Sequence, residues 1–193
     1  MASPVRVFRY RLDSRDRIAW VSPEWLCFAR ENHAERLEPA RVVGRPVWTF
    51  IRGMETQAVY RALFRAVRTR GSQVRIPFRC DSPSMRRYME LCVAPGHCGH
   101  IELSGRLLRA EPRLYLAILD CQLPRQRPRV ELCSFCKRIH VAGCGWFEAD
   151  EALRFIEPFA AEELPELEHG LCDTCAATCG MQVDRAAAEP GPP

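Results

Sequence analysis

The sequence predicts an α+β protein in which a curved antiparallel sheet carries helices on one face and is followed by a small cysteine-rich module of the ribbon or treble-clef type. Several short segments alternate apolar and polar residues with the period of two that is typical of strands. The segment 55–70 instead repeats apolar residues at three- and four-residue steps, which indicates a helix. Two Cys-x-x-Cys pairs lie in the last third of the chain and predict a separate metal-binding module.

Charge divides the chain into the same two parts. Residues 1–130 contain 24 arginines against 12 acidic residues, whereas residues 131–193 contain 4 basic against 12 acidic residues. The acidic part can therefore dock on the basic part, within one chain or in a dimer. The expected boundaries are a first domain at 6–122, a Pro- and Arg-rich linker at 123–131, a four-cysteine module at 132–181 and a disordered tail at 182–193.

The chain begins with a predicted hairpin and a capped helix. Residues 6–12 alternate between two faces, and residues 18–21 form a second short strand after a polar turn. Ser22 is a typical N-cap residue, and Pro23 suits the first position of a helix because its missing N–H would have no helical partner there. Trp25, Phe28 and Ala29 fall on one face of this helix, which we expect to fray near residues 32 and 33.

One long helix and several strands complete the first domain. A connection punctuated by Gly and Pro at 42–51 leads into the helix 55–70, and Gly71 ends it because glycine readily adopts a left-handed C-cap. The alternation after this helix predicts strands at 73–80, 88–94, 101–108 and 114–119. Pro77 places the first of these strands at a sheet edge or a bulge.

The first domain resembles a PAS domain over roughly residues 8–122. The motifs that carry the resemblance are Tyr-Arg-Leu-Asp-Ser at 10–14 with the segment 18–21, the connection 43–46, the helix start 55–60, and Pro-Phe-Arg-Cys-Asp-Ser-Pro at 77–83 with Arg86 and Arg87. The last motif is similar to that of a particular bacterial group of PAS proteins. A PAS sheet usually ends in three strands, so the resemblance makes the segment 101–108 surplus. It also implies ligand sensing or protein association, with dimerisation through the first hairpin.

Charged residues surround the turn after the strand 73–80. Arg79, Asp81, Arg86 and Arg87 can bind an anion or the carboxylate of a partner. Because residues on the two arms of a tight turn lie close together, we expect an ion pair within the hairpin instead.

Five aromatic residues of the first domain are candidates for lining a ligand pocket between helices and sheet, although such residues more often form an ordinary core. They are Trp48, Phe50, Tyr60, Phe64 and Phe78. The helix 55–70 has no histidine to serve as the proximal ligand of haem-binding PAS domains. The reactive-cysteine motif of light-sensing PAS relatives is also absent from the sequence. The resemblance therefore does not extend to haem or flavin.

The two Cys-x-x-Cys pairs predict a structural zinc site formed by Cys133, Cys136, Cys172 and Cys175, with 35 residues between the pairs. Two intervening residues let both sulfurs of a pair reach one ion at about 2.3 Å, and a second pair completes a tetrahedral four-thiolate site. The substitute ligands, each a second choice, are His169, Cys144, Cys179 and His140.

Two other interpretations of these cysteines remain. A thioredoxin-like redox pair would lie at the start of a helix in a βαβ pattern, which the sequence around Cys133 does not follow. The remaining alternative is a set of free or disulfide-bonded thiols.

The C-terminal module is similar to short tails of bacterial PAS and signalling proteins. The similarity lies in the segment 133–139, Trp146 and the segment 169–175. We expect helices at 148–155 and from Cys172 onward.

No catalytic motif is present: the sequence has no Gly-rich phosphate loop, no G-x-S-x-G and no kinase segment. We therefore expect a non-enzymatic bacterial signal-sensing or adaptor protein that acts through a protein partner or a homodimer, with room for a small-molecule ligand. One alternative is a zinc-containing nucleic-acid-binding transcriptional regulator, although the arginines are dispersed rather than clustered. The other is a thiol redox sensor. The sequence has no apolar run that would span a bilayer or form a signal peptide, so we expect a cytoplasmic location without membrane contact.

Overall fold

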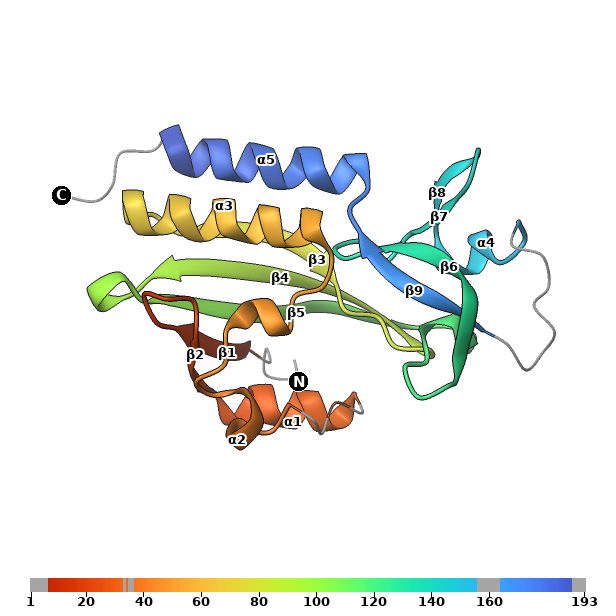
Figure 1. Cartoon of the computed structure of the whole chain (residues 1–193), viewed down its shortest axis with the longest axis horizontal. Coiled ribbons are helices and arrows are strands. Elements are labelled where there is room, and N and C mark those ends of the chain that lie inside the picture. Colours follow the sequence, from red (N-terminus) through yellow and green to blue (C-terminus); the bar gives the residue numbers. More distant parts are fainter. Residues whose placement is uncertain (1–6, 33, 35–36, 156–163, 189–193) are drawn as a thin grey trace.

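The larger of two sheets has five strands in the order β2-β1-β5-β4-β3, and every neighbouring pair is antiparallel (Figure 1). The computed structural model describes residues 7–32, 34, 37–155 and 164–188. The strands are β1 (Val7–Leu12), β2 (Ile18–Val21), β3 (Val74–Arg79), β4 (Met85–Pro95) and β5 (Ile101–Pro112). The predicted α+β class with an antiparallel sheet is confirmed.

One face of this sheet is buried under helices and the other is polar. The helices that follow the first hairpin are α1 (Pro23–Glu31), α2 (Pro39–Val42), the 3-10 turn η2 (Val47–Thr49) and α3 (Met54–Arg70). Directly opposed residues such as Tyr10 and Leu103 share a face, and the buried side chains of that face form one core with α3. The other face carries exposed ion pairs, including Arg75 with Glu90 at 2.9 Å. The period-two pattern of the strands therefore matches their burial.

The helix boundaries follow the capping signals in the sequence. The hydroxyl of Ser22 accepts a hydrogen bond of 3.2 Å from the backbone N–H of Trp25, and Pro23 starts α1. Gly71 ends α3 with a φ of 70°, and its N–H donates to the carbonyl of Val67 at 3.0 Å. Glycine tolerates this left-handed conformation because it has no Cβ. Both predicted helix ends are confirmed.

The prediction of a last strand at 114–119 is wrong. This segment contains the 3-10 turn η4 (Ala117–Leu119). Its alternating burial arises because Leu116 and Ile118 pack into a second core, with Leu132 and Ile139 of the C-terminal part, while Leu114 stays exposed. The sheet consequently ends in three strands, β3, β4 and β5, and the segment 101–108 is part of β5 rather than surplus. A short 3-10 turn, η3 (His97–Gly99), joins the last two strands.

The segment predicted as a linker at 123–131 lies mainly in a strand, β6 (Arg125–Cys133). It pairs in parallel with β9 (Leu164–Gly170), and the pairing shifts register between Gln126 and Arg129. This irregularity accommodates Pro128, which has no N–H to donate to a regular ladder. Tertiary pairing therefore overrides the local preference of a Pro- and Arg-rich segment.

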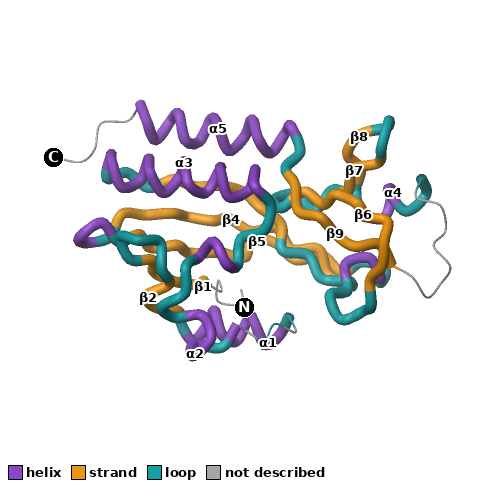
Figure 2. The backbone as a smooth tube through the Cα atoms, viewed as in Figure 1, coloured by secondary structure: helices purple, strands orange, loops and turns teal. Residues whose placement is uncertain are grey.

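The smaller sheet has the order β8-β7-β6-β9, with β7 (Ile139–Val141) and β8 (Gly145–Phe147) as a hairpin (Figure 2). The helix predicted at 148–155 is shorter than expected, since α4 spans only Ala149–Ala152. The last element, α5 (Asp173–Ala188), lies beside α3 over the larger sheet (Figure 1). The tail predicted at 182–193 is therefore helical as far as Ala188, and 189–193 lie outside the described residues. Among the described helices, none is long and apolar enough to cross a membrane.

Candidate metal centre

The first pair of cysteines lies in a tight turn at the end of β6. The N–H of Lys137 donates to the carbonyl of Cys133 at 3.1 Å, and Lys137 has a left-handed φ of 62°. The ammonium group of Lys137 also donates to the carbonyl of Ser134 at 2.7 Å. This turn, residues 133–137, brings Cys136 back beside Cys133. We call it the knuckle.

The second pair lies between β9 and α5. Cys172 immediately precedes the helix, and its carbonyl accepts the N–H of Ala176 at 2.9 Å. Cys175 is in the first turn of the helix. The helix expected from Cys172 is confirmed.

Parallel pairing of β6 and β9 brings the two pairs together. Cys133 is in register with Gly170, and the N–H of Ser134 donates to the carbonyl of Gly170 at 2.9 Å. Both strands therefore end at the same edge of the small sheet, and each is followed by one cysteine pair. A parallel connection requires a long crossover, which accounts for the separation of the pairs in sequence.

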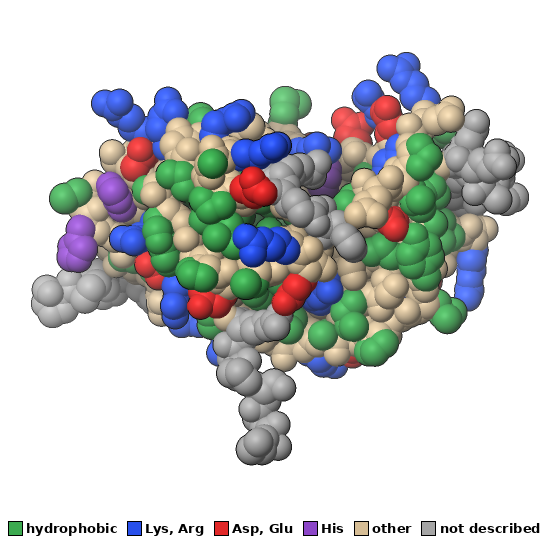
Figure 3. Space-filling view, turned by 90° about the horizontal axis from the view of Figure 1, so that it is seen from below, with side chains coloured by type: hydrophobic (Ala, Val, Ile, Leu, Met, Phe, Trp, Pro, Cys, Tyr) green, Lys and Arg blue, Asp and Glu red, His purple; other side chains and the backbone are tan. Residues whose placement is uncertain are grey.

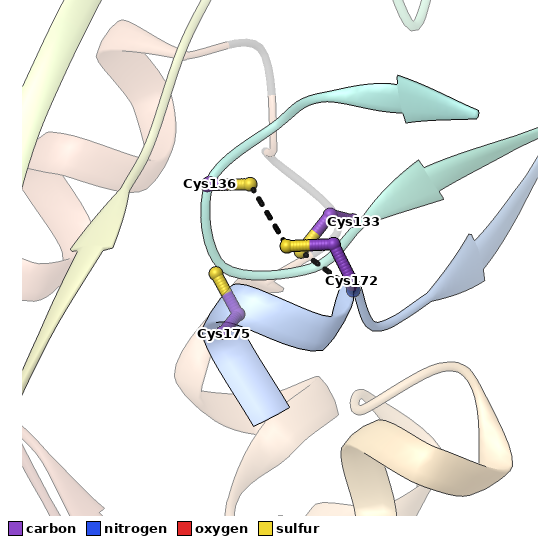
Figure 4. A group of neighbouring side chains, drawn as sticks. All are labelled: Cys133, Cys136, Cys172 and Cys175. Carbon is purple, nitrogen blue, oxygen red and sulfur yellow. Dashed lines mark hydrogen bonds between the residues drawn. The ribbon is translucent and has the colours of Figure 1, made fainter. Parts of the chain in front are cut away.

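The four sulfur atoms form one compact cluster and can bind a metal ion (Figure 4). All four Sγ atoms lie within 4.8 Å of one another, and those of Cys136 and Cys172 are 3.6 Å apart. In a tetrahedral site with Zn–S bonds of about 2.3 Å, the sulfurs are about 3.8 Å apart. Cys133 and Cys172 are buried, and Cys136 and Cys175 are partly exposed. All eleven cysteines lie in the described part of the chain and are free thiols.

Hydrogen bonding within the cluster separates the proton affinities of its thiols. Hydrogen bonds from Cys136 and Cys175 hold the pKa of Cys133 well below its ordinary value. Hydrogen bonding to Cys133 raises the pKa of Cys136 and of Cys175. The thiolate of Cys133 is therefore favoured over those of Cys136 and Cys175. A divalent cation bound to the cluster would favour the thiolate form of its ligands, because a metal-bound thiol is deprotonated.

None of the substitute ligands belongs to the four-cysteine cluster. Among the described His, Cys, Asp and Glu residues, the four cysteines are the group whose ligand atoms lie close enough together to hold one ion. Cys144 is exposed, and Cys179 is a buried thiol of α5. The ring of His140 lies 5.2 Å from that of Trp146. His169 is half-buried, and its pKa is lowered by burial and then by the nearby charges of Lys137 and Arg52.

The five candidate pocket residues do not line one common cavity among those found in the described part of the chain. Phe64 is buried in the core, and its ring lies 5.6 Å from that of Trp48 and 5.8 Å from that of Tyr60. Phe50 is partly buried at the edge of this core. Phe78 lies instead beside the cysteines, in a cavity described below.

The knuckle is joined directly to the larger sheet. The N–H of Arg79 at the end of β3 donates to the carbonyl of Phe135 at 2.6 Å. The hydroxyl of Thr56 donates to that of Ser134 at 2.8 Å, and the rings of Tyr60 and Phe135 stack at 5.9 Å. Gly53 approaches so closely that a Cβ there would lie 2.2 Å from the carbonyl oxygen of His169. We call these contacts the seam between the two parts.

An ion-pair network beside the seam joins the basic first part to the acidic second part. Arg79 pairs with Asp81 in its own hairpin, as predicted, and with Glu148 of the second part at 2.6 Å. Arg113 also pairs with Asp81, at 3.1 Å, and Arg86 with Glu148 at 3.1 Å. The acidic part thus docks on the basic part within one chain. The charge asymmetry indicated this docking, but the individual partners depend on the tertiary fold.

The surface distribution of the arginines follows their dispersed distribution in the sequence. Seen from below, basic side chains are interspersed with acidic and hydrophobic ones on the face that Figure 3 shows. The dispersed arginines of the sequence therefore stay dispersed on this face of the described residues, where they do not form one basic patch.

The similarity of this chain to known proteins is one of structure, at low sequence identity. No family model matches the chain, and no curated protein matches it. Among solved structures, a domain of an HTR-like protein from Haloarcula marismortui ATCC 43049 is similar to it, with 17% identity and a TM-score of 0.36. The match covers 54% of this chain and 99% of that domain.

Proposed function

We propose that this chain is a non-enzymatic signal-sensing or adaptor protein in which zinc fastens a C-terminal helix to a PAS-like sheet domain. The observation that carries the proposal is the position of the cysteine cluster. Cys133 and Cys172 belong to the same hydrophobic core as the larger sheet and α3. A metal at this point would hold the knuckle and α5 against the sensor domain.

Zinc is the metal that suits the donor set best. Four thiolates from two tight turns favour a tetrahedral ion with an affinity for sulfur, and zinc in such closed sites is structural. The binding free energy then adds to the free energy of folding, because the unfolded chain does not present the four sulfurs together.

The PAS-like assignment is supported by the order of elements. Two strands, helices, a long helix and three closing strands follow one another, and all five strands form one antiparallel sheet. The motif at 77–83 lies at the seam, where its Arg79 contacts the knuckle and Glu148. The signal would leave through protein contacts, with a partner or in a homodimer, and a change at the seam would shift the population of interface states.

The deciding experiment measures metal content in chain purified without added metal. We expect about one zinc ion per wild-type chain and none in the double variant Cys133→Ser/Cys172→Ser. The matched control is Cys27→Ser/Cys144→Ser, because these two thiols are exposed and outside the cluster. A metal-free wild type that is folded would overturn the zinc assignment.

A thiol redox sensor is the second candidate, because the sulfurs of Cys136 and Cys172 lie only 3.6 Å apart. This function predicts that a mild oxidant releases the metal and joins cluster cysteines in a disulfide that a thiol reductant reverses. Mass spectrometry after graded hydrogen peroxide treatment tests it. Retention of the metal after oxidation of the exposed thiols would argue for the structural role.

A further inference from the structure

A cavity of about 290 Å³ lies between the end of the larger sheet, the knuckle and α5. The sheet contributes Phe78 and Met89, the knuckle contributes Phe135 and Cys136, and α5 contributes Cys175 and Cys179. The lining thus combines aromatic rings with sulfur atoms, which make favourable contacts with aromatic rings. Two of its residues are also members of the metal-binding cluster.

Two polar side chains of this lining, Arg79 and Thr178, are already engaged, and the hydroxyl of Tyr88 is a further, neutral polar group. The guanidinium of Arg79 pairs with Asp81 and Glu148, so its aliphatic stem is left to line the wall. The hydroxyl of Thr178 donates to the carbonyl of Thr174 at 2.8 Å. The lining is mainly apolar, so a charged ligand would lose its hydration here with little compensation, and this cost favours a neutral one.

The size of the cavity restricts the ligand further. A cavity of about 150 Å³ holds benzene, and drug-sized ligands need about 300–1,000 Å³. The space here therefore suits one or two fused rings and is too small for a peptide helix about 10 Å across. Leu108 lines the cavity and is 53% exposed, so the cavity reaches the surface.

We propose that this cavity binds a neutral aromatic molecule of one or two rings and that binding is coupled to the metal centre. A ring in the cavity covers the partly exposed sulfurs of Cys136 and Cys175 and keeps water and competing chelators from them. Coupling between two sites is reciprocal, so the metal strengthens ligand binding to the same degree. The coupling rests on the zinc function proposed above, whereas binding of the ring does not.

Indole is a suitable probe, and the methyl group of Met89 reports on it. We would titrate indole into the full-length protein, purified with its metal and labelled with [¹³C-methyl]methionine. A saturable shift of the Met89 signal is expected in the wild type. Thr178→Phe fills the cavity and should weaken binding at least about tenfold. Ala177→Phe is the matched control, because Ala177 is the neighbouring exposed residue of α5 and is outside the lining.

The same samples separate the two proposals. Saturating indole should slow zinc release to a chelator in the wild type and in Ala177→Phe but not in Thr178→Phe. Leu108→Trp, at the mouth of the cavity, provides a second obstruction if Thr178→Phe does not fold. The inference is overturned if Met89 does not respond, or if the cavity-filling variants bind indole as tightly as the control. Normal zinc content in those samples would leave the zinc function intact.

Discussion

The two hydrophobic cores of the molecule divide the C-terminal part between them. The larger core joins the five-stranded sheet and α3 with Cys133, Phe135 and Cys172. The smaller core is confined to η4, the small sheet and α4, and its buried members are Leu116, Ile118, Leu132, Ile139, Ala149 and Ala152. The cysteine cluster and α5 therefore belong to the sheet domain in packing, although they follow it in sequence.

This difference teaches where the metal matters most. The smaller core has few large side chains and therefore buries little apolar surface. This burial alone stabilises the small sheet only weakly. The cluster lies where β6 and β9 end and α5 begins. A metal here would hold the small sheet and α5 to the larger core at one point, so perturbing either core should produce a different pattern of unfolding.

Metal removal should have the largest effect. Structural zinc binds small peptides with about 10–16 kcal/mol, so a chelator under reducing conditions should release α5 and the small sheet while β4 and β5 stay protected. Amide hydrogen exchange measured by mass spectrometry follows both regions. Continued protection of α5 after complete metal loss would show that apolar packing alone holds it.

Truncation within each core is expected to have the next largest effect. Phe64→Ala in the larger core should lower the free energy of unfolding by about 3–5 kcal/mol, and Ile139→Ala in the smaller core by about 2–5 kcal/mol. Both side chains are buried. The contrast is in extent: we expect the first to raise hydrogen exchange in the whole chain and the second only in the small sheet. Equal exchange patterns would mean that the two cores unfold as one.

Gly53 provides a test of the seam with a matched control. Gly53→Ala places a Cβ 2.2 Å from the backbone oxygen of His169 and also strains a φ of 83°. Gly44→Ala has a similar φ of 80° with no atom within 4 Å, so it should cost only the strain of about 1–2 kcal/mol. Chemical denaturation of both variants should show the larger loss for Gly53→Ala. Equal losses would contradict a close seam.

Removing one charge of the network should have a smaller effect. Glu148→Gln leaves Arg79, whose side chain is 9% exposed, with Asp81 as its remaining acid, and should cost about 1–3 kcal/mol. Glu90→Gln is the control on the polar face, where its partners Arg75 and Arg106 are about half exposed and the expected cost is below about 0.5 kcal/mol. Urea denaturation measures the stability loss of both variants. A larger loss for Glu90→Gln than for Glu148→Gln would contradict a stabilising role of the network at the seam.

The smallest expected effect is a pH dependence at the seam. Burial lowers the pKa of His169 below 6.5 in the folded chain, so the unfolded chain binds the proton more tightly. Stability should therefore fall as the pH drops through about 6.5. The cysteines contribute equally to the pH dependence of the wild type and of His169→Gln, so the difference between the two isolates the imidazole. The variant should lose less stability between pH 7 and 6. Identical slopes would contradict burial of this imidazole.

The sequence by itself determined the features that depend on near neighbours. Two Cys-x-x-Cys pairs, the Ser22 cap, the Gly71 stop and the period-two strands all follow from local geometry and from which side chain faces the core. Each cysteine pair could be predicted as half of a metal site because the ligand spacing of a knuckle is local. The two pairs meet in one four-sulfur cluster through the pairing of β6 with β9.

Tertiary structure decided the features that depend on distant partners. The segment 123–131 forms a strand because β9 pairs with it, and α5 continues to Ala188 beside α3. Leu116 and Ile118 alternate like strand residues but pack into the smaller core. Glu148 meets Arg79 only after the two parts dock. Each depends on contacts between segments far apart in the chain, whose free energy local propensity does not contain.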